Sequence, residues 1–160
     1  MANFKFQRLT PTLPELMNVV TCVLGQKGEI FTDSDRNKAM KMANDGAGYV
    51  MCGDGDEIEA FVDNILPAPL NSEWGSNGEQ IKRIGGGVRR NPMHREQVTV
   101  ATGASVALLD YVVAAPQLAV GVKGLAQVKK GEPKVHMWRV ISFITGNGEA
   151  GSTVLIERNN

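Results

Sequence analysis

The feature that most constrains this fold is a series of short apolar runs separated by glycine, asparagine or aspartate. Such runs occur at 38–43, 49–52 and 58–65, and again at 98–101 and 153–157. Gly, Asn and Asp accept the positive φ that tight hairpins require, so each gap between runs reads as a turn. Short strands joined by such turns favour a barrel or a sandwich. We therefore expect a mainly β protein, a single compact β-barrel or β-sandwich with little helix.

The C-terminal part of the chain continues this pattern. Apolar runs at 106–115, 118–122 and 125–128 predict further strands, and 135–145 predicts a longer one. The turn Gly146-Asn147-Gly148 then leads back into the last strand.

The N-terminal part is less regular. In residues 1–11, Phe4 and Phe6 alternate with polar residues, which predicts an arm containing a short strand. Residues 12–25 fit two structures. A capping-box pattern and helical spacing favour a helix, whereas the β-branched run 19–23 favours a strand. We expect a short turn followed by a strand.

Residues 67–97 interrupt the strand pattern with many Gly and Pro residues. A stretch of this length without regular structure is uncommon inside a compact domain, so we expect a functional loop or a long extended hairpin. No acidic residue lies between Lys82 and Arg95. The basic residues of this stretch are Lys82, Arg83, Arg89, Arg90 and Arg95.

These patterns divide one domain, 1–160, into four segments. They are an N-terminal arm (1–11), a first β segment (12–66), an extended basic loop (67–97) and a C-terminal β segment (98–158).

Charge is distributed unevenly along the chain. Residues 1–80 hold 6 Lys+Arg and 12 Asp+Glu, whereas residues 81–160 hold 11 and 5. Such asymmetry can guide subunits or an acidic partner into contact. Alternatively, the fold simply brings the two halves together.

Several motifs resemble catalytic or ligand-binding signatures but lack essential parts. Residues 146–151 match the glycine spacing of a dinucleotide fingerprint, yet a strand-like run follows where a helix is required. Residues 33–37 begin like a calcium loop, but Lys38 and Asn44 replace its glycine and its bidentate glutamate. We expect a β-hairpin at the first motif and a turn with solvated carboxylates at the second.

The acidic cluster Asp54, Asp56, Glu57 and Glu59 could support acid–base chemistry or bind a cation. Because Asp54 precedes a glycine, a hairpin turn with a solvated face is the favoured interpretation.

The potential nucleophiles and histidines form no recognisable site. Ser105 lacks the following Gly and helix of a nucleophile elbow. His94 and His136 stand apart from any ligand pattern. Cys22 and Cys52 are expected to be reduced, mostly buried thiols, although their spacing leaves a disulfide open. We expect no catalytic residue, metal site or cofactor.

The basic stretch is the strongest functional signal. Nucleic acid is one possible partner, but only Trp74 lies near enough to supply base stacking, and the sequence pI is about 6.7. An acidic protein surface is the favoured partner, and no apolar run is long enough to predict a membrane span.

Four segments carry a resemblance to a known family, namely residues 35–42 and 49–62 in the first half and residues 138–142 and 151–158 in the closing hairpin. They resemble the capsid decoration (cement) and head-stabilising proteins of short-tailed bacteriophages. Ala60 stands where this family pattern has glycine.

This resemblance implies an accessory structural protein that binds the outside of an expanded capsid and bridges its subunits. The implied partners are the major capsid protein and further copies of the chain in a homotrimer, without direct nucleic-acid or membrane binding. The implied location is the outer capsid surface of the virion, after synthesis in the host cytoplasm. Alternatives are a head–tail joining or tail protein and, less favoured, a small hydrolase using the carboxylates of 54–59.

The residues predicted to contact the capsid or a neighbouring subunit come from the arm and the basic stretch. They are Phe4, Phe6, Arg8, Trp74, Lys82, Arg83, Arg89, Arg90 and Arg95.

Overall fold

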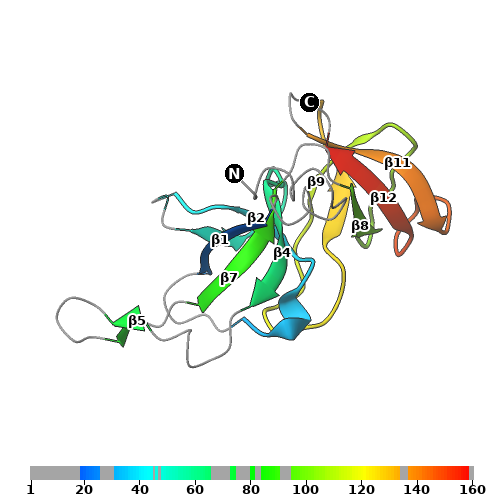
Figure 1. Ribbon diagram of the computed structural model, residues 1–160. Helices are drawn as coiled ribbons and strands as arrows, with labels where there is room; N and C mark the ends of the chain where they lie inside the picture. Colours follow the sequence, from blue (N-terminus) through cyan, green and yellow to red (C-terminus); the bar gives the residue numbers. More distant parts are fainter. Residues whose placement is uncertain are drawn as a thin grey trace, which may run out of the picture.

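The chain folds into a mainly β structure, as its turn-punctuated apolar runs predict (Figure 1). The computed structural model describes residues 19–25, 31–44, 46, 48–65, 73–74, 80–81, 84–90, 95–133 and 137–158. The prediction of a mainly β fold with barrel architecture is confirmed. The structure adds that the described strands close into two barrels, with a separate two-stranded sheet.

Barrel one is closed by five strands in the order β1-β3-β2-β4-β7, with β7 pairing back onto β1. All of its strand pairs are antiparallel except β1 with β3. Its strands are β1 (Val19–Leu24), β2 (Ala39–Met42), β3 (Tyr49–Met51), β4 (Ala60–Ile65) and β7 (Ile84–Arg89).

Barrel two is closed by five strands in the order β10-β8-β12-β11-β9, with β9 pairing back onto β10. Only β8 and β10 run parallel. Its strands are β8 (Arg95–Val100), β9 (Tyr111–Ala114), β10 (Gln127–Lys130), β11 (Trp138–Thr145) and β12 (Thr153–Arg158).

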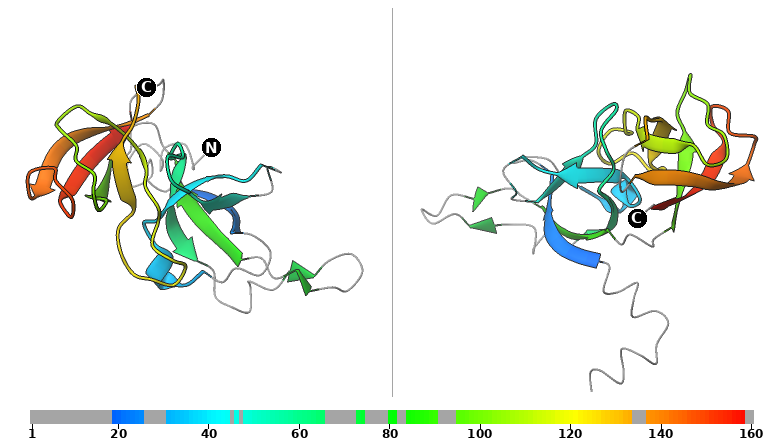
Figure 2. Two further views of the ribbon diagram at one scale, coloured as in Figure 1. Left: turned by 180° about the vertical axis from the view of Figure 1, so that it is seen from behind. Right: turned by 90° about the horizontal axis from the view of Figure 1, so that it is seen from above.

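Three short elements lie outside the barrel sheets. A 3₁₀ turn, η1 (Asp33–Asp35), precedes β2, and β5 (Glu73–Trp74) pairs with β6 (Gln80–Ile81) as an antiparallel hairpin. The hairpin lies apart from both barrels, on the side of barrel one that faces away from barrel two (Figures 1 and 2).

Several local predictions are confirmed. The strand expected near residues 19–23 is β1, and residues 12–18, where the alternative helix would begin, lie outside the described residues. Gly146 and Gly148 have φ values of 71° and 90°, as the turn between β11 and β12 requires. The fingerprint-like stretch 146–151 is therefore a β-hairpin.

The glycine run at the end of the predicted basic loop is instead a barrel strand. β7 pairs with β1 on one side and β4 on the other. A Cβ on Gly86 would overlap Leu24 Cδ1 and lie 2.5 Å from the Asn64 carbonyl oxygen, so only glycine fits between the neighbouring strands. Glycine here permits close backbone approach rather than a loop. The stretch 67–97 thus contributes β7 and the start of β8.

Of the apolar runs predicted as strands in the C-terminal half, one forms a shorter strand than predicted and another forms none. Within 106–115, only β9 is a strand, because the Asp110 carboxylate accepts the Ala107 N–H at 2.8 Å and closes a turn. Residues 118–122 form no strand. Gly121 has a φ of 81°, and its N–H donates to a side chain of barrel one.

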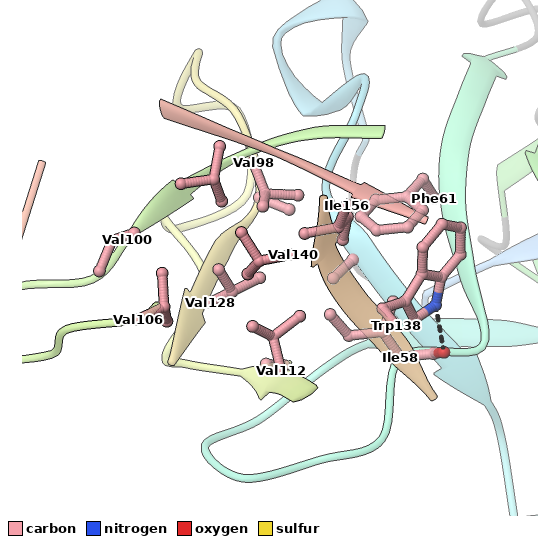
Figure 3. Packing of buried hydrophobic residues seen from close by; sticks show 14 of the residues in the cluster. Ile58, Phe61, Val98, Val100, Val106, Val112, Val128, Trp138, Val140 and Ile156 are labelled. Atoms are coloured by element: carbon pink, nitrogen blue, oxygen red, sulfur yellow. Dashed lines mark hydrogen bonds between the residues drawn. The ribbon is translucent and has the colours of Figure 1, made fainter. Parts of the chain in front are cut away.

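A continuous apolar core fills barrel two and extends into barrel one (Figure 3). Trp138 on β11 is 1% exposed, and its Nε1 donates to the Ile58 carbonyl at 3.0 Å. Its ring packs edge-to-face on Phe61 of β4, with the ring centroids 5.0 Å apart. Since Ile58 and Phe61 come from the first half of the chain, this aromatic contact joins the barrels. A second cluster, including Leu24, Met40 and Val88, fills barrel one.

Candidate contact surface

Two buried charges join the barrels at the segment that does not form a strand. Lys38 Nζ donates to Asp35 Oδ1 at 2.7 Å and to the Ala119 carbonyl at 2.5 Å. Asp35 Oδ1 also accepts the Gly121 N–H at 2.6 Å, and Asp35 Oδ2 accepts the Thr32 N–H at 2.7 Å. Both charged side chains are 1% exposed or less. The pair therefore holds the 119–121 segment of barrel two against barrel one.

This arrangement corrects the prediction of a turn with solvated carboxylates at 33–37. Asp33 is solvated, but Asp35 is buried. Burial alone would raise the pKa of the Asp35 carboxyl. Hydrogen bonds from Lys38, Thr32 and Gly121 outweigh burial and hold the pKa below its usual value. Asp35 therefore acts as a structural anion rather than the start of a calcium loop.

Arg89, one of the predicted contact residues, is engaged inside the molecule. Its Nε and Nη2 donate to Glu96 at 2.6 and 3.1 Å, and its Nη1 donates to Asp63 at 2.9 Å. Nη2 also donates to Asn37 Oδ1 at 3.0 Å, and Nη1 to the Val62 carbonyl at 3.2 Å. Only 14% of its side chain is exposed. This guanidinium joins β4, β7 and β8, so we omit Arg89 from the proposed contact surface.

The next two basic residues of the stretch are exposed. The Arg90 guanidinium lies 5.9 Å from the centroid of the Tyr49 ring. Arg95 is 60% exposed in its side chain, and its Nε donates to Glu157 at 2.9 Å. Arg158 contacts the main chain nearby, since its Nη1 donates to the Arg90 carbonyl at 3.2 Å and to the Glu59 carbonyl at 3.4 Å. It therefore joins the end of β12 to the residues next to β7 and β4.

The structure describes one of the remaining predicted contact residues. Trp74 lies on β5 of the projecting hairpin. The others lie outside the described residues, namely Phe4, Phe6, Arg8, Lys82 and Arg83.

The acidic cluster contains a turn at residues 54–55, as predicted, but this turn does not form a hairpin, because β3 and β4 both pair with β2 rather than with each other. Asp56 accepts the Gly53 N–H at 2.6 Å and pairs with Lys41 at 2.7 Å. The bond from Lys41, aided by Gly53, lowers the pKa of Asp56. Asp54 pairs at 2.7 Å with Lys129 of barrel two. Ion pairs such as this one bring acidic groups of the first half of the chain next to basic groups of the second half.

The other candidate chemical groups do not converge. Ser105 forms an isolated bridge with Glu149, and the two histidines lie outside the described residues. Both cysteines are free, and burial raises the thiol pKa of Cys22 to about 11 and that of Cys52 to about 12. Within the described part of the chain, no three His, Cys, Asp or Glu side chains are grouped to hold a metal.

One feature escaped the sequence predictions. An open depression of about 330 Å³ lies beside β8. Its lining residues come from both halves of the chain and are Asn37, Arg95, Glu96, Gln97, Leu125 and Leu155. Alternation along 95–100 could have indicated which side chains face outward, but the approach of Asn37 and Leu125 is a tertiary contact that the strand pattern does not encode.

Comparisons with protein-family models, with curated proteins and with solved structures found no match. In the described part of the chain, the 3₁₀ turn is far too short to cross a membrane, and no other helix is a candidate for doing so.

Proposed function

We propose that this protein is an accessory structural protein that binds the outside of a bacteriophage capsid and bridges its major capsid subunits. The observation that carries the proposal is the combination of two firmly joined barrels with a hairpin that projects from one of them (Figures 1 and 2). A rigid body with a projecting element is suited to spanning neighbouring subunits. The resemblance of residues 35–42, 49–62, 138–142 and 151–158 to capsid decoration proteins supports the same function.

The exposed basic groups support an acidic protein partner. Arg90 and Arg95 are both exposed, and Arg95 also pairs with Glu157 at 2.9 Å. Each subunit needs to contribute only a few kcal/mol, because repetition over a closed lattice multiplies a weak contact. Self-association as a homotrimer belongs to the same proposal, since a trimer would present three sets of contacts at once.

A pelleting assay tests the proposal. Purified protein is mixed with expanded, undecorated shells of the phage that encodes it. We expect saturable binding at a fixed ratio to capsid subunits and a rise in shell melting temperature. Protein that stays in the supernatant at every concentration would refute the decoration role and favour a head–tail joining or tail protein.

A variant pair locates the contact. Replacing Arg90 and Arg95 with Ser should weaken shell binding and flatten its dependence on salt, because both charges are exposed. The matched control replaces Lys123 and Lys130, two basic residues of barrel two, with Ser. If both double variants bind as the unmodified protein does, the basic residues do not make the contact.

A further inference from the structure

Among the described residues, the first half of strand β8 has a neighbouring strand on one side only. β12 pairs with β8 over residues 95–99, whereas β10 pairs with it only at Thr99 and Val100. The Thr99 N–H donates toward β10, to the Ala126 carbonyl at 2.9 Å. The Val100 N–H points the opposite way and donates to the Ser152 carbonyl at 2.9 Å. These two bonds establish which main-chain groups face each side of the strand.

Alternation along the strand then assigns the remaining groups. The register between β8 and β12 continues without a bulge, so the N–H groups of Arg95 and Gln97 face the same side as that of Thr99. β10 begins at Gln127, opposite Thr99, and does not extend along Arg95 and Gln97. Among the described residues, no strand pairs with this side of 95–98. The main chain of Gln97 therefore presents an open edge.

The open edge lies beside the depression. Arg95, Glu96 and Gln97 line one part of it, and Leu125 and Leu155 supply apolar surface. A volume of about 330 Å³ lies at the small end of the range for ligand sites and accommodates a few side chains. An edge that offers main-chain hydrogen bonds next to a pocket for side chains has the properties needed for strand addition.

The charge of the neighbouring outer face favours an acidic occupant. Glu157 on β12 lies in register between Arg95 on β8 and Arg139 on β11. One carboxylate between two guanidinium groups leaves this row with an excess positive charge. Arg89 adds no attraction, because Glu96 and Asp63 already pair with it. An incoming segment with carboxylates would complete the row, whereas a basic segment would be repelled.

We propose that the open edge of β8 at residues 95–98, together with the depression beside it, binds an extended acidic segment of a partner protein as an added strand. Main-chain bonds to Gln97 hold the segment, its apolar side chains contact Leu125 and Leu155, and its carboxylates face Arg95. The inference does not depend on the partner being a capsid protein, because it concerns only the chemistry of the segment.

The direct test uses isotope-labelled protein and an eight-residue probe peptide of alternating Val and Asp. We expect peptide-dependent NMR shifts centred on Gln97, Leu125 and Leu155. The Gln97 amide should exchange rapidly without the peptide and slowly with it, whereas the Val98 amide, which faces β12, should be protected in both states. A peptide of alternating Val and Lys should bind about tenfold more weakly, the effect of about 1.4 kcal/mol.

Two perturbations separate strand addition from other binding. Gln97→Pro removes only the outward N–H and leaves the bonds to β12 in place, so we expect about a tenfold loss of affinity. Gln97→Thr, which keeps the N–H, should bind within about threefold of the unmodified protein. If the Pro variant does not fold, a probe peptide N-methylated on alternate residues tests the same bonds on the unmodified protein. The proposal would be overturned if the N-methylated peptide or the Val–Lys peptide bound as tightly as the Val–Asp peptide. It would also be overturned by NMR shifts away from β8, or by no shifts at millimolar peptide.

Discussion

At the residue scale, the buried pair of Lys38 and Asp35 is the most sensitive point of the molecule. Lys38→Met removes the cation but leaves the Asp35 carboxylate inside the protein. Removing one partner of a buried ion pair typically costs about 3–5 kcal/mol. We expect a loss of this size in the free energy of unfolding, measured by urea denaturation.

The double variant Asp35→Asn with Lys38→Met removes both charges and provides the control. It should recover part of the lost stability, because no unpaired charge remains buried. A double variant that is less stable than Lys38→Met alone would contradict this account.

The Asp35 carboxyl also makes stability depend on pH. Its pKa is lower in the folded protein than its usual value of about 3.9, so its stabilisation is complete above about pH 5 and is lost as the pH falls through the folded-state pKa. The stability advantage of the unmodified protein over Asp35→Asn should therefore shrink progressively as the pH falls below about 4. Curves that remain equally far apart from pH 7 to pH 3 would show that Asp35 does not titrate in this way.

At Leu109, in contrast, a substitution is expected to increase the stability of the fold. Leu109 has a φ of 70°, and 61% of its surface is exposed. A left-handed conformation costs a side-chain-bearing residue about 1–2 kcal/mol. Glycine avoids this cost, but part of the resulting gain in stability is lost because glycine has greater conformational freedom in the unfolded chain. Leu109→Gly should raise the free energy of unfolding by about 0.5–1 kcal/mol.

The neighbouring residue supplies a matched control. Leu108 is also exposed but does not have a positive φ. Leu108→Gly should therefore lower stability, since it adds freedom to the unfolded chain without relieving strain. If both substitutions shift the urea midpoint in the same direction, strain at Leu109 is not the cause.

At the scale of elements, β7 depends on the absence of a side chain at Gly86. Gly86→Ala would place a Cβ against Leu24 and the Asn64 carbonyl, and the backbone carbonyl cannot move without shifting β4. We expect a loss of about 1–3 kcal/mol in thermal or chemical denaturation. Gly53→Ala is the control, because its Cβ would meet only a side-chain oxygen of Asp56, at 3.2 Å, and no backbone atom. Equal losses from the two substitutions would rule out steric crowding in β7.

This strand also shows how far sequence reasoning reaches. Hairpins such as β2–β3 and β11–β12 are local, and their turn residues predict them correctly. β7 lies in a stretch predicted to be a functional loop or a long extended hairpin, because its many Gly and Pro residues interrupt the strand pattern. Its position is determined by close contact with β1 and β4, which are distant in the sequence.

The candidate surfaces also contain some residues that the sequence could identify and others that depend on tertiary contacts. Sequence charge identifies Arg90 and Arg95 as exposed basic groups, and the structure places both on the surface. The same pattern could not distinguish Arg89, because its partners Asp63 and Glu96 are brought together only when the barrels form. The open edge of β8 was equally unpredictable, since it exists because β10 is too short to cover it.

At the scale of the whole molecule, the two barrels are expected to unfold as one unit. Their joint core contains Phe61 from β4 and Trp138 from β11, and the turn before β4 shares main-chain bonds with β9, including Gly55 N–H to the Ala114 carbonyl at 2.8 Å. Separating the barrels would expose this core to water. Calorimetry of the unmodified protein should therefore show a single transition whose calorimetric and van't Hoff enthalpies agree.

Trp138→Phe tests whether this aromatic contact couples the barrels. Phenylalanine cannot donate to the Ile58 carbonyl, and it fills less of the space against Phe61. The buried carbonyl loses its partner at a cost of about 1–3 kcal/mol, and the smaller ring adds a cavity. We expect a loss of about 2–4 kcal/mol and a broader transition, or two resolved transitions, in calorimetry. Val140→Ala, which removes buried volume within barrel two, should lower stability while preserving one transition. If Trp138→Phe lowers the melting temperature without changing the ratio of the two enthalpies, the barrels are coupled mainly by their other contacts, such as the buried ion pair of Asp35 and Lys38 and the main-chain bond between Gly55 and Ala114.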